Sequence, residues 1–287
     1  MRLSETIKVS CVLVCYNQEK YILDALKSLE LQTYQNVEII ISDDSSCDRT
    51  FEIIKYFLKA CDPNFCEKCV YVQSNPINLG LTRNFENAFE YCTGEIICVF
   101  AGDDISDKCR VNEVVEIMQN REIIAYSSNV ECIDLNSNLI LGLDRKFIPG
   151  IFDLNQFLLR FDSSTELVFN GCSAAYLKSA LVSLRDRPIE TEDFTLYLSS
   201  LINGHVFFDS RKMVKYRVNN PQQASSINGF IDRLIQLDHL LSVALDKKVT
   251  TGELQIVFRR RILKEAIKSI FDLKILNALI LLTCLFL

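Results

Sequence analysis

An excess of positive charge is missing from this sequence of 287 residues, in which 31 Lys and Arg stand against 37 Asp and Glu. The net charge of −6 and the isoelectric point near 5.2 exclude a nucleic-acid binder that neutralises phosphates over a broad surface. Internal repeats and low-complexity tracts are missing as well, and the 49% of hydrophobic residues exclude general disorder. We therefore expect a sizeable core, built either as one large α/β domain with a helical appendage or as two small domains.

A disulfide framework and a complete zinc site are also missing, although the chain has 12 cysteines. No signal peptide is recognisable ahead of them, and they are scattered through apolar strand and helix patterns, as at Cys11, Cys15, Cys92 and Cys98. We interpret them as buried thiols of a protein in a reducing cytosol. Cys66 and Cys69 have the C-x-x-C spacing and Cys61 lies nearby, but no second pair and no neighbouring His completes a zinc site. A metal or redox role of these three residues is the less favoured alternative.

Short β-rich runs alternate with helical patterns from Lys8 to about Asp134, which predicts successive βαβ units and a mainly parallel sheet. The predicted strands are Val9 to Cys15, Val37 to Ser42, Val70 to Ser74 and Glu95 to Ala101. Two helical stripes between them should cover the sheet, one made by Tyr21, Ile22, Ala25, Leu26 and Leu29, the other by Leu81, Phe85, Ala88, Phe89 and Cys92.

The pattern becomes less regular beyond Asp134, and this half up to about Val218 is expected to shape a second substrate site. Two helical segments follow a polar loop, and the second of them has basic residues on one side and apolar residues on the other. The tail from Ile275 to Leu287 is almost entirely apolar but too short to span a bilayer, which takes about 20 residues. We expect it to attach to an anionic membrane surface, and a buried C-terminal helix is the alternative.

Two predicted strands run directly into paired carboxylates. Asp103 and Asp104 follow one strand, and Asp43 and Asp44 follow another. In open α/β sheets, ligands gather beyond the carboxyl ends of the strands, and Mg²⁺ or Mn²⁺ takes carboxylate oxygens together with substrate phosphates. The pattern therefore indicates a cation that carries phosphate. The alternative is that Asp103 and Asp104 only open a turn and cap the helix that begins near Asp107.

Five motifs occur in a fixed order over residues 8 to about 218: V-L-V-C-Y-N with Glu19 close behind, S-D-D-S-S-C-D-R-T, N-L-G-L-T-R-N, A-G-D-D and Glu192-Asp193. This succession resembles the family 2 inverting glycosyltransferases of the GT-A fold. The resemblance implies a Rossmann-like α/β domain over residues 1–220, with a mostly parallel central sheet flanked by helices. Its donor half would span about 1–134 and its acceptor half 135–220, followed by a C-terminal helical extension over 221–287 that contacts the membrane.

The resemblance also implies a donor site at the ends of the first strands. Tyr16 would pack on the base or ribose while the backbone near Cys15 and Glu19 contacts the nucleoside, and Asp44 would accept a hydrogen bond from N3-H of uracil. Asp43 would order the loop. A core aromatic is the alternative for Tyr16.

The resemblance implies that three further residues bind the diphosphate end of the donor. Arg83 would offset phosphate charge, for which a helix-surface salt bridge is the alternative. Asp104 would be the direct ligand of Mg²⁺ or Mn²⁺, with Asp103 nearer the ribose or the sugar, so that the metal stabilises the leaving nucleoside diphosphate.

Asp193 matches the family's catalytic base, and Glu192 would orient the acceptor or support the base. A carboxylate at a helix start is also favourable against the helix dipole, which is the alternative for Asp193. The chain departs from the family at Asn219, where many relatives have a His that helps to bind metal or diphosphate. We interpret His205 and His239 as structural.

The expected function is inverting transfer of a sugar, from a UDP-sugar to a saccharide acceptor that is lipid-linked. It would serve surface polysaccharide synthesis (O-antigen or capsule) at the cytoplasmic face of the inner membrane, with no nucleic-acid partner. A nucleotidyltransferase is one alternative, but it usually has a glycine-rich basic loop after the first strand, and residues 15–20 contain no glycine. A non-catalytic nucleotide-sugar-binding subunit of a membrane assembly complex is another.

Overall fold

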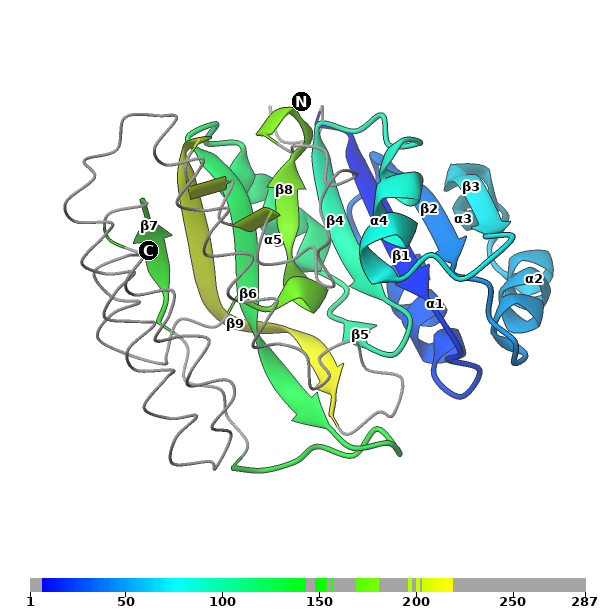
Figure 1. Ribbon diagram of the computed structural model, residues 1–287. Coiled ribbons are helices and arrows are strands. Elements are labelled where there is room, and N and C mark those ends of the chain that lie inside the picture. The colour runs from blue at the N-terminus through cyan, green and yellow to red at the C-terminus, as the bar shows by residue number, and fades with distance from the viewer. Residues whose placement is uncertain are drawn as a thin grey trace, which may run out of the picture.

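Nine strands of the described chain form one twisted sheet in the computed structural model, with helices on both faces (Figure 1). The structure describes residues 7–142, 148–153, 156, 169–180, 196–197, 200–201 and 203–218. The strand order is β3-β2-β1-β4-β8-β6-β9-β5, and β7 pairs with β9 beside this path. The chain thus moves outward from β1 to β3 and then returns to the other side of β1 as β4. This reversal creates a topological switch point between β1 and β4.

The first half of the sheet is parallel, as the sequence predicts. Its strands are β1 (Val9–Cys15), β2 (Val37–Asp43), β3 (Cys69–Ser74) and β4 (Ile96–Ala101), and each boundary agrees with the prediction to within one residue. All seven residues of β1 are buried. Strands covered on both faces favour apolar residues at most positions, which is why β1, β2 and β4 are largely apolar in sequence, whereas the residues of β3 are half-buried or exposed.

The second half of the sheet is mixed. Its strands are β5 (Ile105–Ser106), β6 (Ile123–Ile133), β7 (Gly150–Phe152), β8 (Ala175–Leu177) and β9 (His205–Arg217). Strand β8 is antiparallel to both β4 and β6, whereas the long strands β6 and β9 are parallel to each other. Short antiparallel pairs of β9 with β5 and β7 complete the sheet. The carboxyl end of β9 is thereby brought next to the segment that follows β4.

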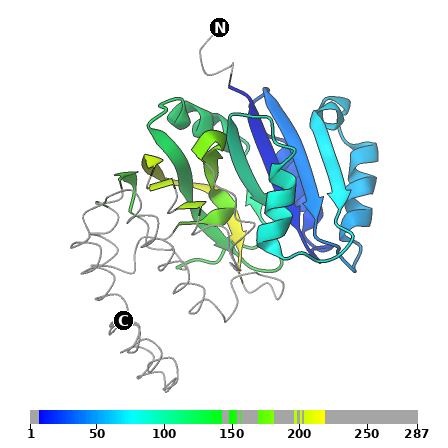
Figure 2. The same ribbon diagram turned by 45° about the horizontal axis from the view of Figure 1, so that its top comes forward.

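The described helices lie on both faces of the sheet (Figure 2). One face carries α1 (Ile22–Glu30), α2 (Thr50–Ala60), α3 (Pro63–Lys68) and α5 (Arg110–Met118), whose apolar residues share one core cluster with β1. The other face carries α4 (Leu81–Phe89), whose Phe85 and Ala88 pack with Tyr197 and Phe208. Two 3-10 turns, Gly171–Ser173 and Lys178–Ala180, flank β8. Both predicted helical stripes are buried against the sheet as expected, apart from Leu81 and Phe89, which are half-buried.

Cys11, Cys15, Cys92 and Cys98 are buried free thiols, as predicted. Burial raises the pKa of Cys98 to about 12, so this thiol stays protonated and unreactive at neutral pH. In the surface cluster, the close pair is Cys61 and Cys66, whose sulfur atoms lie 2.7 Å apart, rather than the C-x-x-C pair. Among the described residues, no group of three or more His, Cys, Asp or Glu side chains has a metal-binding arrangement.

The predicted C-terminal extension over 221–287, with its apolar tail, lies outside the described residues. Within the part of the chain that the structure describes, no helix is long and apolar enough to cross a membrane.

Glu38 on β2 ties the amino-terminal ends of three segments together, away from the carboxyl ends of the strands. Its buried carboxylate accepts hydrogen bonds from Ser10 Oγ and Thr93 Oγ1, both at 2.6 Å, and pairs with Lys8 Nζ at 2.6 Å. Burial raises the pKa of Glu38, but these bonds outweigh it and lower the pKa from 4.5 to about 2. Because the folded pKa is the lower one, the carboxylate stabilises the fold above about pH 4.5, and this contribution is lost as the pH falls towards 2.

Glu38→Gln is therefore expected to lower the free energy of unfolding by about 3 kcal/mol at pH 7, and by about half as much at pH 3. Denaturant unfolding followed by circular dichroism at the two pH values measures this difference. Glu95→Gln is the matched control, since Glu95 is an exposed partner of Arg121 and its loss should cost less than about 1 kcal/mol. An equal loss of stability at both pH values for Glu38→Gln would contradict the assignment.

Candidate active site at the carboxyl ends of β1, β2 and β4

The loops after β1 and β2 are joined by hydrogen bonds into one ordered surface. Asn17, whose φ of 51° allows a sharp turn, donates its backbone N–H to Ser46 Oγ at 2.8 Å and accepts from Cys47 N at 2.9 Å. Asp44 N donates to Cys15 O at 2.9 Å, which continues the β1–β2 pairing beyond the strands. The predicted nucleoside-binding segments therefore lie side by side.

Tyr16 is 37% exposed at the end of β1, so it is not the core aromatic of the alternative interpretation. Cys15 is buried, and its thiol lies 3.7 Å from Asp43 Oδ1. Glu19 is half-buried; its N–H donates to Asp48 Oδ2 at 3.0 Å and its carboxylate accepts from Arg49 N at 3.1 Å. The Glu19 side chain thus fixes the loop to the start of α2, while the ring of Tyr16 stays open to a ligand.

The paired acids after β2 have separate partners. Asp43 orders its own loop, as predicted, since its carboxylate accepts from Ser46 N at 3.0 Å, from Ser46 Oγ, and from Ser74 Oγ at 2.6 Å. Asp44 accepts from Asn75 Nδ2 and Leu79 N at one oxygen and from Gly80 N at the other, all within 2.9 Å. The second oxygen keeps one lone pair for a further donor. Asp44 therefore anchors the start of α4, and its base-reading role stays a prediction.

Arg83 lies in the first turn of α4 and is exposed. It forms no ion pair or hydrogen bond with the residues that the structure describes, which does not favour the salt-bridge alternative. Its guanidinium is available to an anionic ligand near the amino terminus of α4, where the orientation of the backbone N–H groups also favours negative charge.

Asp103 and Asp104 are buried at the end of β4, where the chain passes directly beside the β1 loop. Gly102 makes this approach close: its N–H donates to Val14 O at 3.0 Å, and a Cβ at this position would lie 2.3 Å from Gln18 Oε1 and 2.6 Å from Cys15 Cβ. Only glycine fits here without displacement of the β1 loop. Tight packing across the switch point therefore places the acid pair next to the predicted nucleoside-binding loop.

The acid pair does not cap a helix, as the alternative interpretation would have it. Asp104 Oδ1 accepts from Arg217 N at 2.8 Å, and α5 begins only at Arg110, after a turn in which Asp107 Oδ1 accepts from Cys109 N. Burial and the neighbouring charge of Asp103 raise the pKa of Asp104, although hydrogen bonds from Arg217 and Cys172 oppose the shift. Two buried carboxylates side by side are stabilised by a cation.

The donor set suits Mg²⁺ or Mn²⁺. These ions bind through one or two carboxylates and complete their coordination with phosphates and water, so a site of two acids needs no third protein ligand. Gln18 Oε1, which is buried beside Gly102 and accepts no hydrogen bond from the described residues, is a further unsatisfied oxygen at this position. The residues present therefore fit a divalent cation that carries a diphosphate.

Sequence reasoning missed Arg217, although it noted the segment around Asn219. Arg217 is fully buried, donates Nε to Asp103 O at 2.9 Å and Nη1 to Asp134 O at 2.8 Å, and stacks 4.4 Å from the ring centroid of Tyr21. Arg217 thus fixes the position of the acid pair through hydrogen bonds to both of its residues. The sequence of β9 gives no clear signal for it, because the strand contains four other charged residues and its buried positions do not alternate regularly.

The predicted acceptor-side residues Glu192 and Asp193 lie outside the described residues, as does Asn219, which stands where relatives have a His that helps to bind metal or diphosphate. The structure thus brings together Cys15, Tyr16, Glu19, Asp44, Asp103 and Asp104, with Arg83 on the adjoining helix.

Solved glycosyltransferases share this fold. The chain matches S. aureus TarS 1-349 in complex with UDP-GlcNAc with a TM-score of 0.66 and 17% identity, over 88% of this chain and 71% of TarS 1-349. It matches the mannosyltransferase PcManGT of Pyrobaculum calidifontis, in complex with GDP-Man and Mn2+, with a TM-score of 0.58 and 15% identity, over 90% and 70% of the two chains. The architecture is that of a GT-A glycosyltransferase, and the predicted fold class is confirmed.

The sequence then places the chain within this class. The profile of Glycosyl transferase family 2 matches residues 10–185, and the chain belongs to this family. An uncharacterized glycosyltransferase of Rickettsia typhi is 26% identical over 256 residues, which cover 86% of this chain and 74% of the relative. The Escherichia coli UDP-Glc:alpha-D-GlcNAc-diphosphoundecaprenol beta-1,3-glucosyltransferase WfgD is 27% identical over 237 residues, or 81% and 85% of the two chains. The resemblance read from the motifs is thereby confirmed.

Proposed function

We propose that this glycosyltransferase is an inverting, metal-dependent enzyme that moves a sugar from a UDP-sugar to a lipid-linked saccharide. The observation that carries the proposal is the buried Asp103–Asp104 pair across the switch point from the exposed ring of Tyr16. In this arrangement the nucleoside would pack on the aromatic face and the carboxylates would bind a cation, so the diphosphate of the donor would lie between them. The UDP-GlcNAc bound by TarS and the acceptor in the name of WfgD support the donor and acceptor classes.

In the proposed reaction, an acceptor hydroxyl attacks the anomeric carbon from the face opposite the diphosphate while Asp193 removes its proton. The bond between the anomeric carbon and the phosphate oxygen breaks, and the nucleoside diphosphate leaves with the electron pair. An α-linked donor then gives a β-linked product. Arg83 faces the leaving charge, and Glu192 orients the acceptor or supports the base.

Mg²⁺ or Mn²⁺ held by Asp104, with Asp103 beside it, would supply charge stabilisation for the leaving diphosphate. The Mn2+ in the PcManGT complex supports this assignment. The acceptor suggests a place at the cytoplasmic face of the inner membrane in surface polysaccharide synthesis, with the apolar tail over 275–287 as one membrane contact.

Calorimetric titration of the purified protein with UDP, GDP and dTDP, each with Mn²⁺ and with EDTA, tests the pocket, the base preference and the metal together. We expect UDP to bind in the presence of Mn²⁺, and EDTA to abolish that binding. Tight binding of GDP or dTDP instead of UDP would contradict only the choice of uridine as the base, and the rest of the proposal would stand. Binding of none of the three nucleotides would favour a non-catalytic subunit.

A further inference from the structure

Three leucines are exposed on one short turn that follows β6. Leu135, Leu139 and Leu141 are 42%, 52% and 85% exposed. Single exposed leucines are ordinary in soluble proteins, but a group of them on one protruding segment marks an interaction site. We call residues 134–141 the leucine turn. In Figure 1 it lies at the lower edge of the molecule, towards which the arrowheads of β1 and β4 also point.

The leucine turn is held in a defined conformation. Asp134 Oδ1 accepts from Asn136 N and Asn138 N, both at 2.8 Å, and Ile140 N donates to Cys132 O at 2.9 Å. Ser137, with a φ of 66°, accepts from Arg217 Nη2 at 3.0 Å. An ordered turn loses little conformational freedom when it docks, so its exposed leucines are prepared for burial.

Arg217 joins the leucine turn directly to the acid pair. The same guanidinium that bonds Ser137 Oγ and Asp134 O also bonds the carbonyl oxygen of Asp103. Whatever surface the turn rests on is therefore placed at a fixed position relative to the donor carboxylates.

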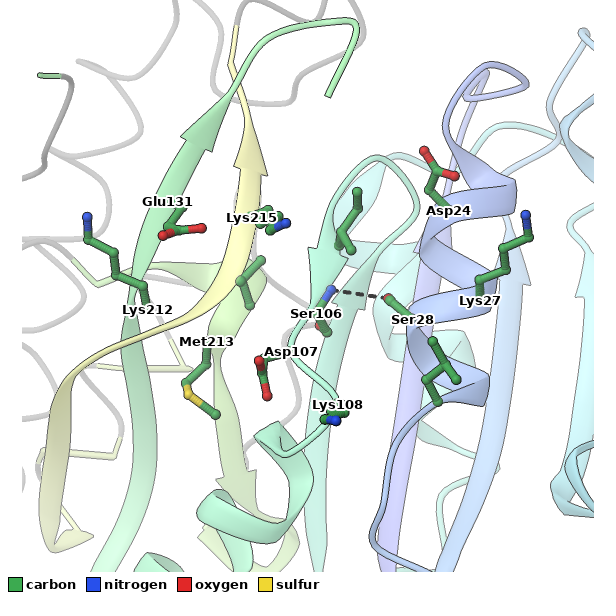
Figure 3. Close-up of a pocket in the computed structure, with 13 residues that line it drawn as sticks. Asp24, Lys27, Ser28, Ser106, Asp107, Lys108, Glu131, Lys212, Met213 and Lys215 are labelled. Atoms are coloured by element: carbon green, nitrogen blue, oxygen red, sulfur yellow. Dashed lines mark hydrogen bonds between the residues drawn. The ribbon is translucent and has the colours of Figure 1, made fainter. Parts of the chain in front are cut away.

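A basic groove of about 640 Å³ adjoins the base of the leucine turn, between α1 and the β6–β9 pair (Figure 3). Its floor includes Ser28 and Ser106, joined by a hydrogen bond of 3.1 Å. Three carboxylates and four exposed lysines line it, which gives an excess of one positive charge in a chain of net charge −6; the lysines are Lys27, Lys108, Lys212 and Lys215. An exposed apolar turn next to a groove that contains lysines matches the interface of an anionic bilayer, where leucine enters the acyl boundary and lysine meets the headgroups.

We propose that the leucine turn inserts into an anionic membrane surface and that the basic groove faces its headgroups. The membrane contact of the described domain is thus distinct from the apolar tail over 275–287. It deepens the proposed function, because Arg217 would then hold the donor site at a set height above a lipid-linked acceptor.

The chain contains no tryptophan, so Leu141→Trp in the full-length protein provides a single fluorescent probe in the leucine turn. On addition of vesicles of phosphatidylglycerol and phosphatidylcholine in equal parts, its emission should shift to shorter wavelength and be quenched by doxyl-labelled phospholipid. Tyr56→Trp is the matched control: Tyr56 is 63% exposed on α2, and its probe should respond to neither.

Lys212→Gln/Lys215→Gln tests the groove. Since each lysine near an anionic surface contributes about fivefold to the partition coefficient, sedimentation with the same vesicles should weaken roughly 25-fold, and the dependence on salt should become smaller. An unshifted, unquenched Leu141→Trp probe in protein that still sediments with vesicles would overturn the proposal and place the contact elsewhere, as at the tail. Absence of sedimentation would overturn it too. If the protein binds UDP but no vesicles, the membrane inference is wrong and the proposed function still stands.

Discussion

Asp104→Asn is expected to abolish metal-dependent nucleotide binding while the protein remains folded. The amide keeps an oxygen that can accept from Arg217 N, so the local structure is retained, but it lacks the charge that a hard cation needs. Because loss of residues that merely support metal ligands costs 10- to 100-fold in affinity, loss of the ligand itself should weaken UDP binding on the order of 100-fold or more. Calorimetry with Mn²⁺ measures the effect, and thermal unfolding confirms the fold.

Asp193→Asn is the companion variant, because it should separate binding from chemistry. UDP affinity in Mn²⁺ should stay unchanged, whereas the rate of sugar transfer should fall by about 10²- to 10⁴-fold, as expected for loss of a general base. Full turnover by Asp193→Asn would exclude this residue as the base. Wild-type affinity of Asp104→Asn for UDP in Mn²⁺ would exclude Asp104 as the ligand.

Arg217→Met is expected to give a large loss of stability in the described domain. It removes a buried guanidinium together with the hydrogen bonds that this group donates to Asp103 O, Asp134 O and Ser137 Oγ. Of these three oxygens, Asp134 O retains a donor in Ser137 N at 3.1 Å. The free energy of unfolding should fall by about 3–5 kcal/mol, equivalent to a melting temperature roughly 10 °C lower.

Arg121→Met serves as the control for this variant. Arg121 is half-exposed and pairs only with Glu95 at the surface, so its loss should cost less than about 1 kcal/mol. Differential scanning fluorimetry compares the two. Equal melting temperatures for Arg217→Met and Arg121→Met would mean that the buried arginine does not hold the site together.

The parallel half of the fold could be predicted because its signals are local. Val9–Cys15 is apolar except for Ser10 and is buried on both faces, and the stripe of α1 repeats at helical spacing, so sequence neighbours alone define both elements. The acid pairs could be placed for the same reason, since each directly follows its strand.

The mixed half could not be predicted, since its pairings join distant segments. Strand β8 is three residues long and owes its position to β4 and β6, while β9 reaches Asp104 from 113 residues further along the chain. The sequence around Arg217 does not predict that Asp103, Asp134 and Tyr21 are its partners. The anchoring of α4 by the carboxylate of Asp44 was hidden for the same reason.

The contact at Gly102 limits how donor preference could be exchanged between relatives. A side chain there would collide with Gln18 and Cys15, so the loop after β1 and the turn after β4 are packed tightly against each other. A chimaera that imports only the first loop would set a foreign surface against the native turn. Grafts that carry both segments together preserve the fit, so the two loops form one exchangeable unit.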